Sequence, residues 1–193
     1  GITKIFGKDT VKDYRFTRSK IGIAAQELSI DWFFPVEKLL LFHAGYYGLP
    51  IQQAKKRVDK IIEKLGLGDK KDARLRQLSG GMKRRYQLAK ALVHDPEIII
   101  LDEPTAGVDV ELRQNLWKNV KYLNKQGVTI ILTTHYLYEA QEMSDRIAIL
   151  NKGNLVALDT TKNLLKKIKT KKITFRVNSS IDLSQKKIDG PSF

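Results

Sequence analysis

The sequence predicts an α/β fold built on a parallel sheet, because strand-like and helix-like runs alternate through its second half. The run Ile98-Ile99-Ile100-Leu101 is continuous and apolar, which is typical of a strand buried on both faces of a parallel sheet. Residues 128–133 and 147–150 repeat this pattern. Apolar residues between Leu112 and Leu123 recur at helical spacing, and a short helix is expected around residues 137–143.

The first half predicts short extended segments followed by helices. Up to about Ala25 the chain has the pattern of short strands, the last of them the apolar run Ile21 to Ala24. One helix is expected after Pro35, which suits the start of a helix. Apolar residues from 54 to 65 predict a second helix, and a third is expected from Ser79 to Val93.

Composition and charge limit the possible functions. The 193 residues include 35 Lys and Arg against 21 Asp and Glu, so the formal charge is +14. Such a charge suits nucleic acid, an anionic membrane surface or an anionic ligand such as a nucleotide. Cysteine is absent, which excludes a disulfide framework and Cys-ligated zinc. No apolar run approaches the roughly 20 residues that a membrane-spanning helix needs.

A small polar and glycine-rich segment opens the third predicted helix. Ser79 is a good N-cap residue, and Gly80 and Gly81 allow another group to approach the start of the helix closely. Unpaired N–H groups and the helix dipole can make such a place a phosphate site. The same three residues also suit a simple cap and turn, so alone they leave both interpretations open.

Polar side chains follow two of the predicted strands. Asp102 and Glu103 end one strand, at the edge where open α/β sheets bind their ligands. Neighbouring residues of a strand point in opposite directions, so one carboxylate can lie near Mg²⁺ and the other near a water. His135 ends the next strand and is expected at the same edge, whereas His43 and His94 are interpreted as structural. The alternative is that the two carboxylates are simply the polar end of a strand and bind no ligand.

Taken together, these segments resemble the ATP-binding cassette (ABC) ATPase family. The resemblance covers roughly residues 1 to 160 and depends on the order and spacing of five motifs. They are the Q-loop residue Gln26, the signature Leu78-Ser79-Gly80-Gly81-Met82 with Met where Gln is commonest, the Walker B strand Ile98 to Glu103, the D-loop Ala106 to Asp109, and the switch residue His135. The phrase from Leu78 to His135 most resembles the ATPase subunits of ABC-2 type transporters, many of them exporters.

The resemblance implies a role for each motif residue, with ATP and Mg²⁺ as ligands. Asp102 would hold Mg²⁺ through its water shell, and Glu103 would be the general base that polarises the attacking water. His135 would contact the γ-phosphate, and Gln26 would approach Mg²⁺ and the water. In the family two cassettes enclose two ATP molecules. The residues that would act across that dimer are Ser79, Gly80 and Gly81, which clamp the ATP of the other subunit, and Asp109, which communicates between subunits.

The resemblance also implies a P-loop NTPase (RecA-like) core with an added helical subdomain, and it divides the chain into four segments. Residues 1–26 would be the end of a β-subdomain and the strand leading to the Q-loop, and residues 27–95 the helical subdomain with the signature. Residues 96–159 would be the RecA-like core, and 160–193 the start of a C-terminal extension. The implied partners are an integral membrane permease and a second nucleotide-binding subunit, forming a homodimer at the cytoplasmic face of the plasma membrane.

One family motif is absent from the sequence. The Walker A loop, G-x-x-x-x-G-K-[ST], should precede Gln26, but the nearest candidate has five residues between Gly1 and Gly7. It also places Asp9 where a Mg²⁺-binding Ser or Thr should be, so residues 1–13 are interpreted as the β-hairpin region that follows Walker A. We therefore expect that the chain is truncated at its N-terminus, that it binds ATP poorly alone and that it is inactive alone.

Three other functions fit parts of the pattern. SMC-type ATPases bind DNA, but they insert long coiled coils between the two halves of the ATPase. In this chain only residues 27–78 separate Gln26 from Ser79, which leaves no room for them. Ribosome-associated ABC-F ATPases are the main alternative and carry two cassettes in one chain. A degenerate cassette used only for assembly is disfavoured by the intact Asp102, Glu103 and His135. The aromatic run Trp32 to Phe34 suits contact with a membrane subunit and disfavours the ABC-F alternative. No nucleic-acid partner is expected, because Lys and Arg concentrate in the C-terminal tail and on solvated helix faces.

Overall fold

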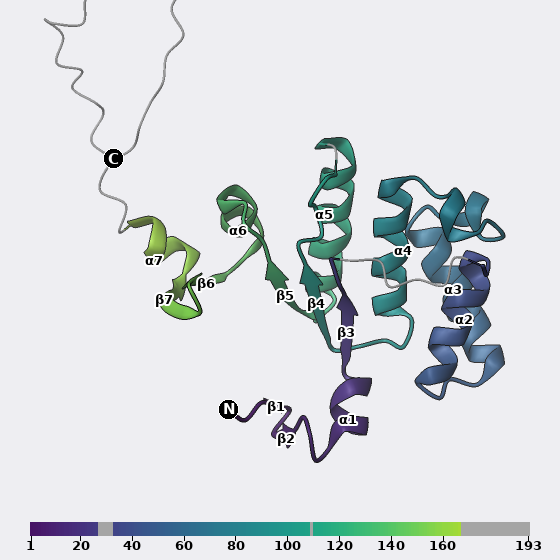
Figure 1. Ribbon diagram of the computed structural model, residues 1–193, viewed down its shortest axis with the longest axis horizontal. Coiled ribbons are helices and arrows are strands. Elements are labelled where there is room, and N and C mark those ends of the chain that lie inside the picture. The colour runs from purple at the N-terminus through teal and green to yellow at the C-terminus, as the bar shows by residue number, and fades with distance from the viewer. Residues whose placement is uncertain (27–32, 109, 167–193) are drawn as a thin grey trace, which may run out of the picture.

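The computed structural model describes residues 1–26, 33–108 and 110–166 (Figure 1). The chain opens with an antiparallel hairpin of β1 (Lys4–Ile5) and β2 (Lys8–Asp9). Its two-residue turn, Phe6-Gly7, has positive φ angles of 49° and 78°, which match the right-handed twist of a tight hairpin. This is the predicted hairpin.

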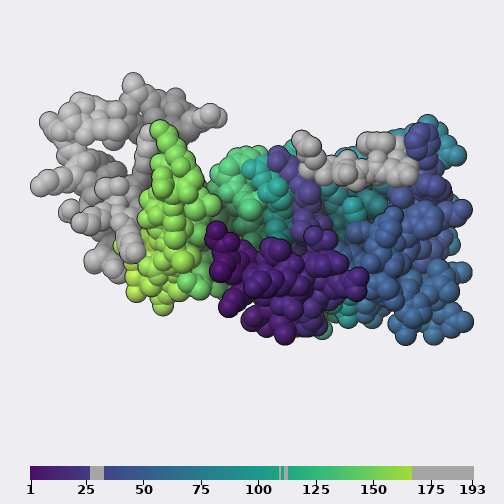
Figure 2. All heavy atoms as spheres, turned by 60° about the horizontal axis from the view of Figure 1, so that its bottom comes forward, coloured from purple at the N-terminus to yellow at the C-terminus, as the bar shows by residue number. Residues whose placement is uncertain are grey.

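A short helix, α1 (Tyr14–Ser19), follows the hairpin where the sequence predicted only extended segments. That expectation was wrong because six residues are too few to show a helical period. Asp9 stabilises the turn before this helix, because its carboxylate accepts hydrogen bonds from the backbone N–H groups of Val11 at 2.8 Å and Lys12 at 3.0 Å. In Figure 2 residues 1–20 (purple) lie between the helices of residues 36–64 (blue) and the hairpin of residues 146–160 (light green).

The central sheet is parallel, as predicted. It has the order β3-β4-β5, formed by β3 (Ile21–Ala24), β4 (Ile98–Asp102) and β5 (Thr129–Thr133). Ile21 is opposite Ile98, and Ile98 is opposite Thr129, so all three strands end at the same edge. Figure 1 shows the strands side by side, with α4 beside β3 and α5 beside β4 and β5.

The helical part forms the best-packed region. It consists of α2 (Val36–Tyr46), α3 (Ile51–Lys64) and α4 (Gly80–Leu92), with 3₁₀ turns at Gly68–Lys70 and Leu75–Gln77. Apolar side chains of these helices and turns are completely or almost completely buried in one cluster, among them Val36, Leu40, Val58, Leu67, Leu75 and Leu88. All three predicted helices are confirmed, and Figure 1 shows α2 and α3 on the side of α4 away from the sheet.

Close packing of α4 on the sheet depends on Gly22. A Cβ at this position would lie 2.0 Å from the backbone oxygen of Ala91, in the last turn of α4. No rearrangement of a flexible side chain could relieve a clash with backbone, so glycine is required here. This contact packs α4 against β3, the strand that leads to Gln26.

The part of the chain after β4 differs from the sequence prediction. The helices α5 (Val110–Lys125) and α6 (Leu137–Met143) are present, but β5 is not buried on both faces: Ile131 is 49% exposed. The strand β6 (Arg146–Asn151) does not join the parallel sheet among the described residues. It pairs instead with β7 (Asn154–Thr160) in a separate antiparallel hairpin. An apolar run signals a strand, but it does not say what covers the faces of that strand.

The hairpin leads into the short helix α7 (Thr161–Lys166). Of the predicted C-terminal extension, residues 167–193 lie outside the described part of the chain. None of the described helices combines the length and the apolar character that crossing a bilayer would require.

Candidate active site

The predicted polar residues meet at the C-terminal edge of the central sheet. Glu103 follows β4, and its side chain accepts hydrogen bonds from two other segments. One carboxylate oxygen, Oε1, lies 2.9 Å from Nδ1 of His135, and the other, Oε2, lies 3.2 Å from Nε2 of Gln26. The structure therefore brings together three residues from three consecutive strand ends, as the sequence predicted.

Asp102 points to a different partner, as expected for the neighbour of Glu103 on a strand. Its Oδ1 atom accepts a hydrogen bond from the hydroxyl of Thr133, which ends β5. The two carboxylates are thus held apart by different hydrogen bonds, and both are half-buried. This separation allows one carboxylate to serve a cation while the other serves a water molecule.

The backbone at Glu103 is strained. Its φ angle is +42°, in the left-handed region that non-glycine residues seldom adopt. The conformation is held by the Glu103 N–H, which donates to the backbone oxygen of Thr133 at 3.1 Å and lies 3.2 Å from the hydroxyl of the same residue. Such strain costs on the order of 1–3 kcal/mol and persists where the surroundings fix the residue. Here it turns the Glu103 side chain away from the strand direction, toward His135 and Gln26.

The segment before Gln26 is held by α4. Arg84 donates to the Gln26 backbone oxygen at 2.8 Å and to the Oε1 atom of Gln87 at 3.0 Å. Gln87 is buried and donates to the backbone oxygen of Ala25 at 2.7 Å. Two side chains of α4 therefore fix the backbone that carries Gln26. Sequence reasoning missed both, although a Gln on the apolar face of a predicted helix was a usable signal.

The predicted signature residues begin α4. Ser79 is the N-cap, and its hydroxyl accepts a hydrogen bond from the Met82 N–H at 3.2 Å. Ser79 and Gly80 are exposed and Gly81 is half-buried, so this helix start is accessible. No hydrogen bond joins these three residues to Asp102 or Glu103 in the described structure. Asp109, the predicted dimer residue, lies outside the described residues.

The oxygen-rich edge fits magnesium only as a partly hydrated ion. Mg²⁺ prefers hard oxygen ligands and keeps several waters, and the Asp102 carboxylate offers such an oxygen. Among the described residues no group of three or more His, Asp or Glu side chains could enclose a metal. The remaining ligands would therefore have to be water molecules and phosphate oxygens.

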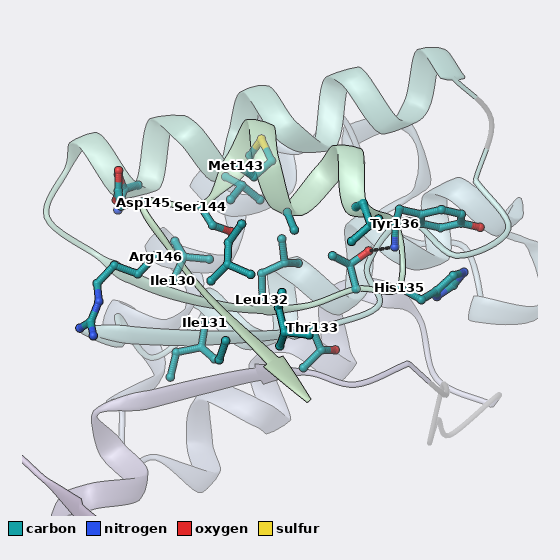
Figure 3. Close-up of a pocket in the computed structure, with 18 of the residues that line it drawn as sticks. Ile130, Ile131, Leu132, Thr133, His135, Tyr136, Met143, Ser144, Asp145 and Arg146 are labelled. Atoms are coloured by element: carbon teal, nitrogen blue, oxygen red, sulfur yellow. Dashed lines mark hydrogen bonds between the residues drawn. The ribbon is translucent and has the colours of Figure 1, made fainter. Parts of the chain in front are cut away.

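A cavity of about 900 Å³ lies beside the site, between β5, α6, β6 and the end of α5. Figure 3 shows Thr133, His135 and Tyr136 at one end of this cavity, and Asp145 and Arg146 at the other. Its walls are mostly apolar along β5. The site thus lies at one end of this cavity, next to β5.

The other two histidines are part of the packing, as predicted. The His94 ring stacks on Tyr47 with ring centroids 3.6 Å apart, and its Nε2 donates to the Ile21 backbone oxygen at 2.9 Å. Burial lowers the pKa of His94, and burial together with nearby Lys90 lowers the pKa of His43 to about 4. Both rings are therefore neutral at physiological pH.

Comparison with known proteins identifies the family of this arrangement. The family model described as ABC transporter matches residues 1–106. The linearmycin resistance ATP-binding protein LnrL of Bacillus subtilis (strain 168) is 37% identical over 85% of this chain and 51% of its own length. The Nod factor export ATP-binding protein I of Rhizobium sp. (strain N33) is 38% identical over 81% of this chain and 52% of its own. This chain therefore spans about half the length of these relatives.

Solved structures share the fold. An ATP binding subunit of an ABC transporter matches with a TM-score of 0.75 at 23% identity, over 84% of this chain and 68% of its own. The cbiO1 protein of Clostridium perfringens, part of the ABC transporter complex cbiONQ, matches with a TM-score of 0.74 at 29% identity, over 85% of this chain and 67% of its own. The α/β fold with its parallel sheet is thus that of ABC ATP-binding subunits. Because the family model covers more than half of the residues, this chain belongs to the ABC transporter family.

Proposed function

We propose that this chain provides the water-activating half of an ATPase site in an ABC exporter. The observation that carries the proposal is the position of Glu103, whose carboxylate lies between His135 and Gln26 beside Asp102. Glu103 acts as the general base that polarises the attacking water. His135 donates Nδ1–H to Glu103, and its Nε2 atom can donate to an oxygen of the γ-phosphate only when that nitrogen carries a proton as well. This is catalysis by positioning and charge stabilisation.

The remaining predicted residues have supporting roles in this proposal. Asp102 holds hydrated Mg²⁺, which when bound neutralises charge on the phosphates. Gln26 orients the water and senses the state of the site. Ser79, Gly80 and Gly81 present an accessible helix start to the ATP of a second cassette, and Asp109 acts across the same dimer.

An exposed aromatic surface supports a membrane permease as the partner. Phe33 is 77% exposed, and Phe34 contacts Phe42 edge to face with ring centroids 5.4 Å apart. Tyr46 extends this surface along α2 and is also exposed. Exposed aromatic clusters of this kind mark protein contacts. We also propose that the subunit lies at the cytoplasmic face of the membrane, as its membership of the ABC transporter family implies. The relatives named for linearmycin resistance and Nod factor export favour an ABC-2 type exporter, and the substrate is set by the permease.

The test uses a fusion that supplies the phosphate-binding loop. In this P-loop fusion, residues 1–193 follow an added amino-terminal segment that carries a G-x-x-x-x-G-K-[ST] loop. Glu103→Gln should lower ATP turnover by roughly 10²–10⁴ while ATP binding, measured by calorimetry, is retained. Glu142→Gln, on the exposed side of α6, is the matched control and should leave turnover unchanged. Unaltered turnover in Glu103→Gln would remove Glu103 from the role of base.

A further inference from the structure

A buried carboxylate lies behind the site. Glu139 on α6 is 1% exposed, and it is the only acidic side chain among those the structure describes that is buried. A charged group in the interior is costly unless hydrogen bonds and opposite charge compensate it. The partners of Glu139 therefore indicate what this carboxylate does.

Its first partner belongs to the turn that follows Glu103. The hydroxyl of Thr105, itself 1% exposed, donates to Oε1 of Glu139 at 2.5 Å. Within the same turn the Ala106 N–H donates to the Glu103 backbone oxygen at 3.1 Å. One oxygen of Glu139 is thus attached to the turn that positions the Glu103 backbone.

Its second partner belongs to the turn that carries His135. The hydroxyl of Thr134 donates to Oε2 of Glu139 at 3.0 Å and accepts from the Tyr136 N–H at 3.0 Å. These two bonds fix the residues on either side of His135. Figure 3 shows His135 and Tyr136 projecting from this turn at one end of the cavity.

Arg113 on α5 completes the cluster. Its Nε atom lies 3.5 Å from Oε1 of Glu139 as an ion pair, and its NH2 group donates to the Val108 backbone oxygen at 3.4 Å. The guanidinium also lies over the Tyr136 ring, 5.4 Å from the centroid. Arg113 therefore compensates the buried charge and contacts the loop after Thr105 as well as the turn after His135.

We propose that Glu139 is a positioning residue for the Glu103–His135 pair, because its carboxylate ties the turn after Glu103 to the turn that carries His135. Only the expected effect of Glu139 on ATP turnover rests on the proposed ATPase function. The effect on His135 itself needs no nucleotide. A carboxylate suits this position because its two oxygens accept from both hydroxyls at once, whereas an amide offers one oxygen only.

The decisive experiment is nuclear magnetic resonance of the 193-residue chain without ligand. The chain has three histidines, so long-range ¹H–¹⁵N spectra at about pH 8.5, where imidazoles are neutral, resolve each ring. In the unmodified chain His135 should show the Nδ1-protonated tautomer, because Nδ1 donates to Glu103. In Glu139→Gln we expect His135 to shift to the Nε2-protonated form typical of free imidazole. The signals of His43 and His94 should not move.

The control and the second variant separate positioning from folding. Glu142→Gln on the same helix should leave all three histidine signals unchanged. If Glu139→Gln disturbs the whole spectrum, Thr134→Val decides instead, because it removes one hydroxyl at nearly constant shape and should shift His135 alone. An unmoved His135 in a folded Glu139→Gln or Thr134→Val chain overturns the proposal, whatever the ATPase does.

Turnover gives an independent readout in the P-loop fusion. Glu139→Gln should lower kcat by about 10-fold to 100-fold, with KM for ATP changed less than about 3-fold, because displacement of a catalytic pair costs rate and not binding. A rise in KM with unchanged kcat would contradict a positioning role. If Glu103→Gln leaves turnover unaltered, the proposed function fails, and the histidine spectra still decide the role of Glu139.

Discussion

The helical part and the region after β4 differ sharply in how well they are packed. In α2, α3 and α4 whole side chains such as Leu40 and Val58 have no exposed surface. In β6 and β7 no residue is buried, and Leu150 and Leu158 are more than half exposed. Both regions are rich in apolar residues, so the difference lies in what each has to pack against.

The candidate site lies at the boundary between these two regions. Glu103 follows β4, which packs through Ile99 and Leu101, whereas His135 follows the exposed edge strand β5. The site therefore depends on a few hydrogen bonds between the segments that follow β4 and β5, those of Thr133 with Asp102 and of Glu139 with its two threonines. Substitutions in the two regions should therefore have unequal effects.

Matched leucine truncations should give the largest difference. Leu40→Ala removes a side chain with no exposed surface and should cost about 2–5 kcal/mol of unfolding free energy. Leu158→Ala, in β7, removes a side chain that is 53% exposed and should cost less than about 0.5 kcal/mol. Urea denaturation of both variants measures the difference, and equal costs would show that the two regions are packed alike.

Matched glycine substitutions test the contact between α4 and β3. Gly22→Ala introduces a Cβ 2.0 Å from the Ala91 backbone oxygen and should destabilise the chain by about 1–3 kcal/mol. Gly45→Ala, inside α2 with open space around the new methyl group, should stabilise it by about 0.5–1 kcal/mol. Thermal unfolding measures both signs. A Gly22→Ala chain as stable as the original would mean that α4 does not need this close approach.

Acid should weaken the helical part through its two histidines. Their pKa values are lowered on folding, that of His43 to about 4, so below about pH 6.5 the unfolded chain takes up protons that the folded chain does not. Unfolding free energy should therefore be fully present above that pH and fall as the pH drops toward 4. Denaturation midpoints between those values measure the slope, and His43→Gln should flatten it. A midpoint that does not change with pH would contradict the neutral, packed state of these rings.

The exposed edge should be a site of self-association. Ile131 in β5 is 49% exposed on an edge strand of the central sheet, and such edges pair with other chains. Ile131→Lys should reduce aggregation, measured by light scattering at increasing concentration, with less than about 0.5 kcal/mol change in unfolding free energy. Gln53→Lys, on the exposed surface of α3, controls for the added charge. Equal reduction by both variants would show that charge alone is responsible.

Some of these features could be predicted from the sequence, and others could not. Apolar periodicity locates β4 and α4, and parallel strands that end together place Asp102, Glu103 and His135 at one edge. The burial of β5 was mispredicted because an apolar run does not reveal its neighbours. Glu139 and Arg84 were missed because their partners are far apart in sequence and follow no period. Such contacts become visible only when the strand ends are placed in space.

We propose that Glu103 and His135 act as one unit, and a double-mutant cycle can show whether they do. ATP turnover would be measured in the P-loop fusion for Glu103→Gln, His135→Ala and the double variant. The two side chains are 2.9 Å apart and are proposed to act in the same step, so removing either one should remove most of their joint effect on turnover. The double variant should therefore be about as slow as the slower single variant. Losses that multiply across the two changes would contradict the account.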